Sequence, residues 1–206
     1  MSYKLMGAAS LAAVSGATGL AVANREKIFG KSKTLADELK EKGYKLISGV
    51  SDTGKRKTIL DAKVDAYKKL KDSSQEFTGK NKEAMSADIL LKSCQELETL
   101  SDYKSVSSKF KKWCVLDFND VLVTIEGKKA ISDGGSDGAN WKTPLKAHRA
   151  QMKLVITGVT DNDSGDTQWG KVKEWCDSTF KAPYSHDSKD DFDRVKSWCL
   201  TSEKQD

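Results

Sequence analysis

The chain has 206 residues, which is enough for one domain of ordinary size or two small ones. Charged residues make up 32% and the hydrophobic set 37%, so the composition excludes a chain that is disordered throughout. The net charge of +5 comes without a dense basic stripe interleaved with aromatic residues, which argues against nucleic acid as a partner. Only two prolines, with many Lys, Glu, Ala and Leu residues, favour helices.

The first predicted element is the uncharged stretch at 5–23, within a hydrophobic N-terminal segment at 1–24. A helix rises about 1.5 Å per residue, so this stretch just reaches across the hydrocarbon core of a bilayer. It predicts a transmembrane-type helix whose partner is membrane lipid. Ala21-Val22-Ala23 also fits a signal peptide cleaved after Ala23. We expect the uncleaved anchor, because a single lysine, Lys4, precedes the apolar run.

After a basic linker at 25–33, the chain contains one unit twice, at 34–114 and 118–199, and ends in a polar tail at 200–206. The second copy lies 82 to 85 positions after the first. The landmarks, in order, are GYKLIS and GKKAIS (43–48 and 127–132), SD (51–52 and 136–137), KTIL and KTPL (57–60 and 142–145), Cys94 and Cys176, and the endings Trp113-Cys114 and Trp198-Cys199. Self-similarity at a fixed period is the signature of a repeat, so we expect two tandem repeats of about 84 residues.

The first helix of each unit is expected at 34–42 and 118–126. Gly43 and Gly127 follow these helices, as glycine commonly does at a helix C-terminus. A short extended piece is then expected near 44–48.

The second copy is ambiguous near 121–131, because Val121 to Ile125 is rich in β-branched residues and fits a strand as well as a helix. The second helix of each unit is expected at 57–71 and 142–156, where apolar residues recur at helical spacing.

The third and fourth helices carry the cysteines. In the first copy the third helix holds Cys94 and the fourth ends near Cys114, and Cys176 and Cys199 take these places in the second. The predicted N-caps of the fourth helices are Ser101 and Ser188. The fold class is therefore mainly α, as two four-helix units or one interlocked bundle.

Four cysteines allow three disulfide connectivities, and the repeat selects one of them. It pairs Cys94 with Cys114 and Cys176 with Cys199, tying the third helix of each unit to the fourth. The alternative is four buried free thiols, which pack as small apolar side chains. Zinc is not expected, because ligand pairs spaced two to four residues apart are missing.

The flanking charges and the cysteines favour opposite orientations in the membrane. The linker at 25–33 is more basic than the region before the apolar stretch, which by the positive-inside rule puts the bulk of the chain in the cytoplasm. Disulfides instead require an oxidising compartment. We expect a cell-membrane protein whose bulk is extracellular. The basic first part, net +7 over 25–112, fits either attraction to anionic lipid or ordinary solvated helix faces.

The glycine-rich loop at 49–56 is one residue short of a phosphate-binding loop. Arg56 stands where a Ser or Thr would bind magnesium, and the matching loop in the second copy has no lysine. An ordinary loop before a helix is the better interpretation.

Other motifs are weaker still. The segment at 161–166 resembles a calcium loop, but glycine and glutamate are missing from its required positions. His148 and His186 belong to no recognisable nucleophile or metal pattern. We therefore assign no catalytic residue, metal ligand or cofactor. The tryptophans beside the cysteines, Trp113, Trp175 and Trp198, are expected to pack in the core against the bridges.

The small-residue N-terminal segment, the GYKLIS-like pieces and the ending Lys-x-Trp-Cys together resemble a large family of uncharacterised proteins of haemotropic mycoplasmas, wall-less bacteria that live on red blood cells. The resemblance covers most of the chain. It implies a membrane-associated, surface-exposed member of a multigene family, with a role in host attachment or antigenic variation. It implies no catalytic residues.

Three functional hypotheses follow. The first is a non-enzymatic, membrane-anchored surface protein that binds the host or is recognised by it. The second is a cytoplasm-facing, membrane-associated scaffold. The third is a nucleotide-binding enzyme that uses Lys55 of the glycine-rich loop.

Overall fold

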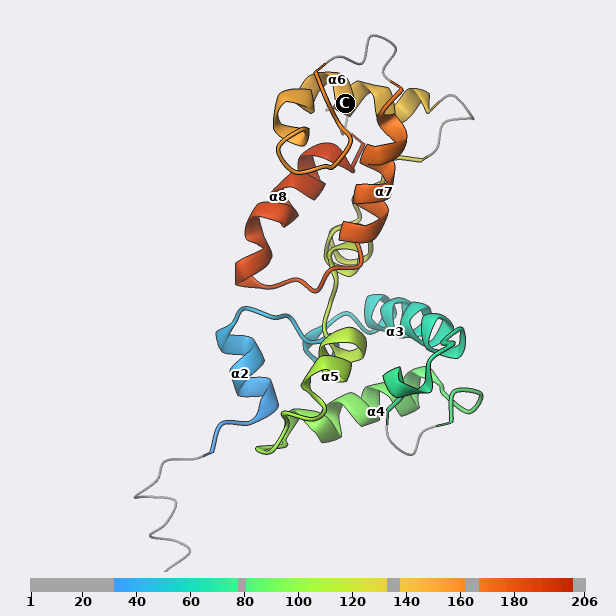
Figure 1. Cartoon of the computed structure of the whole chain (residues 1–206). Helices are drawn as coiled ribbons and strands as arrows, with labels where there is room; N and C mark the ends of the chain where they lie inside the picture. Colours follow the sequence, from blue (N-terminus) through green and yellow to red (C-terminus); the bar gives the residue numbers. More distant parts are fainter. Residues whose placement is uncertain (1–31, 78–80, 133–137, 162–166, 202–206) are drawn as a thin grey trace, which may run out of the picture. The chain divides into compact units, whose positions relative to one another are not determined.

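The computed structural model describes residues 32–77, 81–132, 138–161 and 167–201. The chain divides into two compact units, Met1–Lys33 and Thr34–Asp206, and the helices labelled in Figure 1 all lie in the second. Over the described ranges this unit is built from helices without any strand, which confirms the mainly α prediction.

The predicted membrane segment at 5–23 and the cleavage position after Ala23 lie outside the described residues. Within those residues, none of the helices combines the length and the apolar character needed to cross a bilayer.

The first half of the unit holds four helices and two short 3-10 turns. In chain order they are α2 (Leu35–Glu41), η1 (Ile47–Gly49), α3 (Thr53–Lys68), η2 (Ser73–Gln75), α4 (Ala87–Glu98) and α5 (Ser107–Cys114). Three of the helices start at a polar side chain that accepts a hydrogen bond from the first turn; these caps are Thr34, Asp52 and Ser86.

The second half repeats the order of the helices but not that of the 3-10 turns. Its elements are the π-helical turn η3 (Asp120–Ile125), α6 (Ala139–Met152), α7 (Trp169–Thr179), the turn η4 (His186–Ser188) and α8 (Lys189–Trp198). In the register of the repeat, η3 takes the place of α2, and α6, α7 and α8 take the places of α3, α4 and α5. Figure 1 shows α7 and α8 beside each other next to α6, and both contact it.

The correspondence extends to the backbone. Gly43 and Gly127, 84 positions apart, both have left-handed φ angles, of +75° and +73°. This conformation favours glycine and ends the first helix of each half, as predicted.

Isolated β-bridges also recur at matching positions. Leu46 pairs with Val115 in the first half, and Ala130 pairs with Leu200 in the second. Each bridge joins the piece after the first helix to the residue that follows the second cysteine, so the two ends of each unit meet.

The structure corrects several details. The strand alternative at 121–125 is wrong, because the helical turn η3 covers these residues. A reciprocal cap between Asp117 and Asp120 starts a helix there. Tertiary contacts override the preference of the β-branched residues for a strand. The extended piece at 44–48 is reduced to the bridge at Leu46, since η1 begins directly after it.

Helix starts were also misplaced. α3 and α6 begin before the predicted residues 57 and 142, because Asp52 caps α3 and Gly138 precedes α6. Ser101 is not an N-cap, since α5 begins at Ser107. Ser188 does precede α8, but its side chain does not cap that helix.

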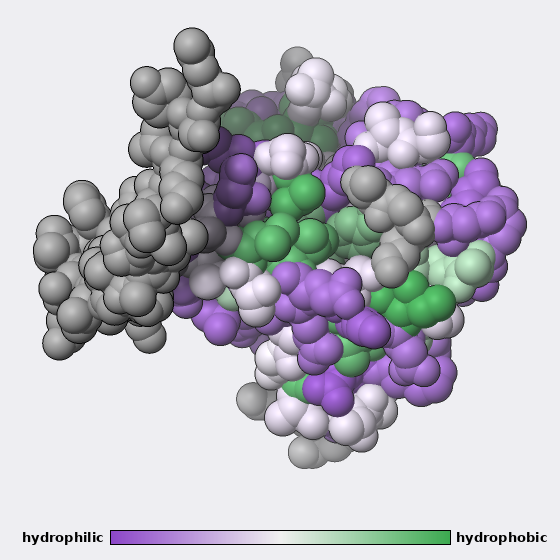
Figure 2. Space-filling view, turned by 90° about the horizontal axis from the view of Figure 1, so that it is seen from below, coloured by the Kyte–Doolittle hydropathy of each residue, from purple (hydrophilic) through white to green (hydrophobic). Residues whose placement is uncertain are grey.

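The interior is continuous and apolar, and the outer surface is mainly polar. Figure 2 shows one face on which hydrophilic residues surround separate hydrophobic areas. In the described ranges, the large hydrophobic side chains classed as exposed are Ile89 and Leu100, at 37% each, and Leu154, at 79%. Leu154, two residues after the end of α6, is the most exposed of them.

Candidate functional site

Two disulfides tie neighbouring helices together. Cys94 of α4 pairs with Cys114 of α5, with 5.5 Å between their Cα atoms. Cys176 of α7 pairs with Cys199 after α8, with 5.7 Å between their Cα atoms. These are the pairs that the internal repeat predicts, and all four side chains are fully buried.

Two of the three tryptophans beside the cysteines, Trp113 and Trp198, lie in the core as predicted, whereas Trp175 is only partly buried against it. Trp113 and Trp198 each expose 3% of their surface. The ring N–H of Trp113 donates to the carbonyl of Gln75 at 2.9 Å, and its ring packs edge-on against Tyr67. The ring of Trp198 lies 5.2 Å from that of Trp175, measured between centroids. These side chains therefore fill the interior around each bridge.

The charged groups of the glycine-rich loop are engaged within the protein. Asp52 Oδ1 accepts a hydrogen bond from the backbone N–H of Lys55 at 3.0 Å, so a carboxylate already lies where a nucleotide phosphate would bind. Nζ of Lys55 donates to the carbonyl of Ile125 at 2.6 Å, and Arg56 donates to the carbonyl of Val50 at 3.0 Å. The loop therefore forms the N-terminus of α3 and contacts the end of η3 through Lys55. This geometry disfavours the binding of a nucleotide.

A cleft of about 840 Å³ lies beside this loop. It runs from the end of α2 along residues 44–52 to the start of α3 and the last turn of α4. Its volume is in the range of ligand sites, roughly 300–1,000 Å³. No pattern in the sequence indicates this cleft, because its walls come from segments that lie far apart along the chain, from Lys40 to Ile125.

The walls of the cleft are mixed in character. Apolar side chains such as Leu46 and Leu116 alternate with Lys40, Lys45 and Glu98. Over the described residues, Oε1 of Glu98 is buried and accepts no hydrogen bond. A surface with apolar walls and single charges of both signs suits a protein segment better than a highly charged small molecule.

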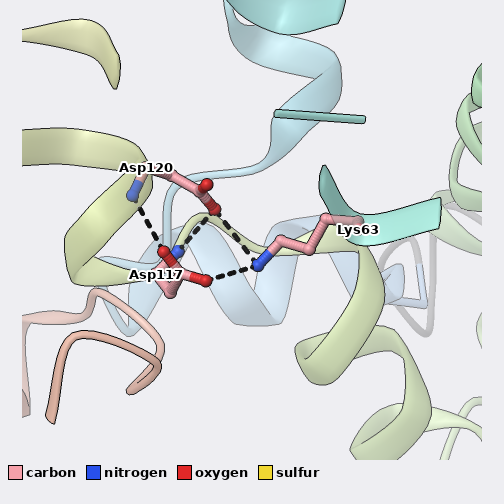
Figure 3. A network of polar contacts seen from close by, with 3 residues as sticks. All are labelled: Lys63, Asp117 and Asp120. Atoms are coloured by element: carbon pink, nitrogen blue, oxygen red, sulfur yellow. Dashed lines mark hydrogen bonds and ion pairs between the residues drawn. The ribbon is translucent and has the colours of Figure 1, made fainter. Parts of the chain in front are cut away.

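A buried ion cluster joins the two halves (Figure 3). Nζ of Lys63 on α3 lies 2.7 Å from Oδ2 of Asp117 and 3.1 Å from Oδ2 of Asp120. The backbone N–H of Asp117 donates to Asp120 at 3.0 Å, and that of Asp120 donates back to Asp117 at 2.8 Å. The side chains of Lys63 and Asp120 expose only 11% and 5%. Each buried charge is thus paired and hydrogen-bonded, as burial requires.

The cluster perturbs two of its groups. Burial raises the pKa of Asp120 to about 6, and the nearby Asp117 adds to this, although Lys63 opposes it. Burial acts to lower the pKa of Lys63, but the two carboxylates outweigh it and hold that pKa above its ordinary value. The lysine therefore stays charged, while the Asp120 carboxyl can take up a proton near neutral pH.

This cluster was missed at the level of sequence, although a signal exists. Thr34 and Asp37 form a reciprocal cap at the start of α2. Asp117 and Asp120 form the same cap 83 positions later, at the start of η3. Because Asp117 stands where the first copy has Thr34, the cap of the second copy has one more carboxylate than that of the first. The partner of this carboxylate is Lys63, a lysine on the apolar face of α3.

The histidines lie in different environments. His148 lies on α6, with Nδ1 3.2 Å from Oε1 of Gln151. His186 lies at the start of η4, where its backbone N–H donates to the carbonyl of Lys42 at 3.2 Å. Its ring packs so closely on Gly43 that a Cβ there would lie 2.1 Å from the ring. The structure does not bring the two histidines together, and His186 has a packing role.

Most of the calcium-like segment, 162–166, lies outside the described residues. Its first residue, Asp161, pairs with Nζ of Lys153 at 2.6 Å. In the ranges that the structure covers, no group of three or more His, Cys, Asp or Glu side chains could hold a metal ion.

Comparison of the chain with protein-family models, with curated proteins and with solved structures finds no match.

Proposed function

We propose that this chain is a non-enzymatic, membrane-anchored surface protein that binds a protein partner outside the cell. Residues 5–23 hold it in the cell membrane, and the disulfide-linked helical unit lies on the extracellular side. A host-cell protein is the expected partner, and exposure to the host makes an antigenic role part of the same proposal.

The observation that carries this proposal is the double cysteine pairing in a chain with an apolar segment of membrane length. Protein disulfides persist outside the reducing cytosol, and the two pairs lie at matching positions between helices. Accidental proximity of four thiols does not account for such a regular arrangement.

Two further points support it. The cleft beside α3 offers apolar walls with single charges of both signs, which is the chemistry of a protein-binding surface. The resemblance to the surface-exposed multigene family of haemotropic mycoplasmas implies the same location and kind of function.

Protease treatment of intact cells tests the location. We expect added protease to remove the helical unit from intact cells while a cytoplasmic marker stays whole. A helical unit that is cleaved only after the cells are lysed would contradict the proposal.

The charges at 25–33 favour a second candidate, a scaffold on the cytoplasmic face of the membrane. A thiol-labelling experiment separates the two. In the surface protein, denaturation in a membrane-impermeant thiol reagent should label no cysteine before reduction and all four cysteines after it. Labelling of all four without reduction would favour the scaffold.

A further inference from the structure

The cleft beside α3 contains a carboxylate that its surroundings leave without a donor. Glu98, the last residue of α4, lines the cleft, and its Oε1 atom is buried and accepts no hydrogen bond from the part of the chain that the structure describes. A buried carboxylate oxygen without a donor is unfavourable. Glu98 as a residue is only half-buried, and the terminal torsion of glutamate is soft, so a small rotation presents this oxygen to a cation in the cleft.

The internal repeat indicates that the fold does not need this carboxylate. Glu98 stands four residues after Cys94 on α4, and Phe180 stands four residues after Cys176, directly after α7. Phe180 is buried, with 9% of its surface exposed. An apolar side chain therefore fits this position of the unit and avoids the cost of burying a charge. The carboxylate is a property of the first copy, as expected of a group that serves binding.

The lysines that line the cleft do not satisfy Glu98. Nζ of Lys55 donates to a carbonyl at the end of η3 at 2.6 Å, and Nζ of Lys45 lies 4.5 Å from the centroid of the Tyr184 ring. Lys40 is exposed on α2. None of the three donates to Oε1 of Glu98. The group that this carboxylate lacks is therefore a cation from outside the chain.

Another wall of the cleft offers backbone groups for pairing. Val50 and Asp52 have extended backbones, with φ and ψ of −74° and 114° and of −70° and 110°. Ser51 lies between them, and its backbone N–H and carbonyl make no hydrogen bond with the described residues. In an extended segment, these two groups of one residue can both pair with an extended peptide. Gly49 adds space, since a Cβ there would meet no atom within 4 Å.

We propose that the cleft binds an extended peptide segment of the protein partner, with a basic side chain paired with Glu98 and the peptide backbone paired with Ser51. The buried side chains of Leu46, Val50 and Leu116 form an apolar wall for the residues beside the basic one. This inference rests on the proposed function as a protein that binds another protein, and it specifies the chemistry of the segment that is bound.

Titration of the isotope-labelled full chain in detergent micelles with short peptides, followed by NMR, tests this proposal. The probes are acetylated and amidated pentapeptides of the form Ala-Val-X-Val-Ala, in which X is Arg, Leu or Glu. The Arg peptide should shift the amide signals of Ser51 and Gln95 and bind about tenfold more tightly than the other two. Glu98→Gln keeps the size of the side chain but removes its charge, and it should abolish this preference for Arg.

Two further variants control the experiment. Glu96→Gln removes an exposed charge from the same helix outside the cleft, so it should leave the affinity for the Arg peptide unchanged. Gly49→Phe fills the cleft without meeting a neighbouring atom at its Cβ, so it should abolish binding. The melting temperatures of Glu98→Gln and Glu96→Gln should match that of the wild type, which excludes unfolding as the cause of any loss.

Three outcomes would overturn the proposal. The first is an Arg peptide that does not bind, or that binds no more tightly than the Leu and Glu peptides. The second is a Glu98→Gln chain that still prefers the Arg peptide. The third is full affinity in Gly49→Phe, which would place the peptide elsewhere. Because the experiment uses purified protein, its result is independent of the protease experiment on intact cells, and the failure of one is distinguishable from the failure of the other.

Discussion

The caps at the start of α2 and η3 have the same design and opposite surroundings. The Thr34–Asp37 cap lies at the surface, whereas the Asp117–Asp120 cap is buried against Lys63 of the preceding half. The same local motif thus starts a helix in both halves. In the second half it also docks that half onto the first, through Lys63. The contact at the junction depends on positions at which the copies differ, since Asp117 stands at the register position of Thr34, and Lys63 at that of His148.

The largest expected effect comes from breaking the buried cluster. Lys63→Met keeps the length of the side chain but leaves two buried carboxylates without a cation, so we expect a loss of about 3–5 kcal/mol in the free energy of unfolding. Urea denaturation measures it. Lys57→Met on the same helix removes an exposed ion pair with Asp61 and should leave the unfolding midpoint unchanged. Equal effects of the two variants would contradict the role of the cluster.

Removing one disulfide should cost somewhat less. The cysteine separations are 20 and 23 residues, so replacing either pair by alanine should lower the free energy of unfolding by about 3 kcal/mol. The comparison is between Cys94→Ala/Cys114→Ala and Cys176→Ala/Cys199→Ala, measured by urea denaturation. If only one of the two double variants lost stability, the disulfides would not play equivalent roles in the two halves, which would contradict the shared architecture.

The paired glycines should differ in a defined way. Gly127→Ala meets no neighbouring atom and suffers only from its left-handed φ, so we expect a loss of about 1 kcal/mol. Gly43→Ala has the same φ and also collides with the ring of His186, so its loss should be about 2 kcal/mol or more. Thermal melting compares the two. A double variant with His186→Ala should reduce the penalty at position 43 and not at position 127.

The smallest expected effect is a pH dependence. Because the pKa of Asp120 is raised to about 6 from an ordinary 3.8, the folded state binds a proton more tightly than the unfolded state between these values. This group therefore adds stability as the pH falls, roughly 1 kcal/mol between pH 7 and pH 5, and the gain is lost as the pH rises through 6.

Asp120→Asn isolates that contribution, because the amide keeps an acceptor oxygen but does not titrate. Relative to this variant, the wild type should become more stable from pH 7 to pH 5. A constant difference between the two proteins over that range would show that Asp120 does not titrate there.

Much of the fold was predictable because it depends on local pattern. Apolar spacing located α3, α4, α6 and α7, and glycine marked the ends of the first helices. The cysteine pairing followed from the register of the repeat. The start of α5 was not predictable in the same way, since Val106 at its N-cap makes no side-chain cap hydrogen bond.

The candidate site was less predictable, because it is made by tertiary contacts. The β-branched run at Val121 to Ile125 forms a helical turn since the cap and Lys63 hold its start and Lys55 holds its end. The cleft beside α3 draws its walls from segments that are distant in sequence, among them Lys40 and Glu98. A single sequence shows the spacing of residues along the chain but not which distant segments come into contact.

The central claim is that one cysteine-paired helical unit occurs twice in this chain. Disulfide mapping tests it most directly, by digesting the protein isolated from its own cells without reduction, after alkylation of free thiols, and identifying the linked peptides by mass spectrometry. We predict two linked peptides, one joining Cys94 to Cys114 and one joining Cys176 to Cys199. A peptide that joins a cysteine of one half to a cysteine of the other, or four alkylated cysteines, would contradict the account.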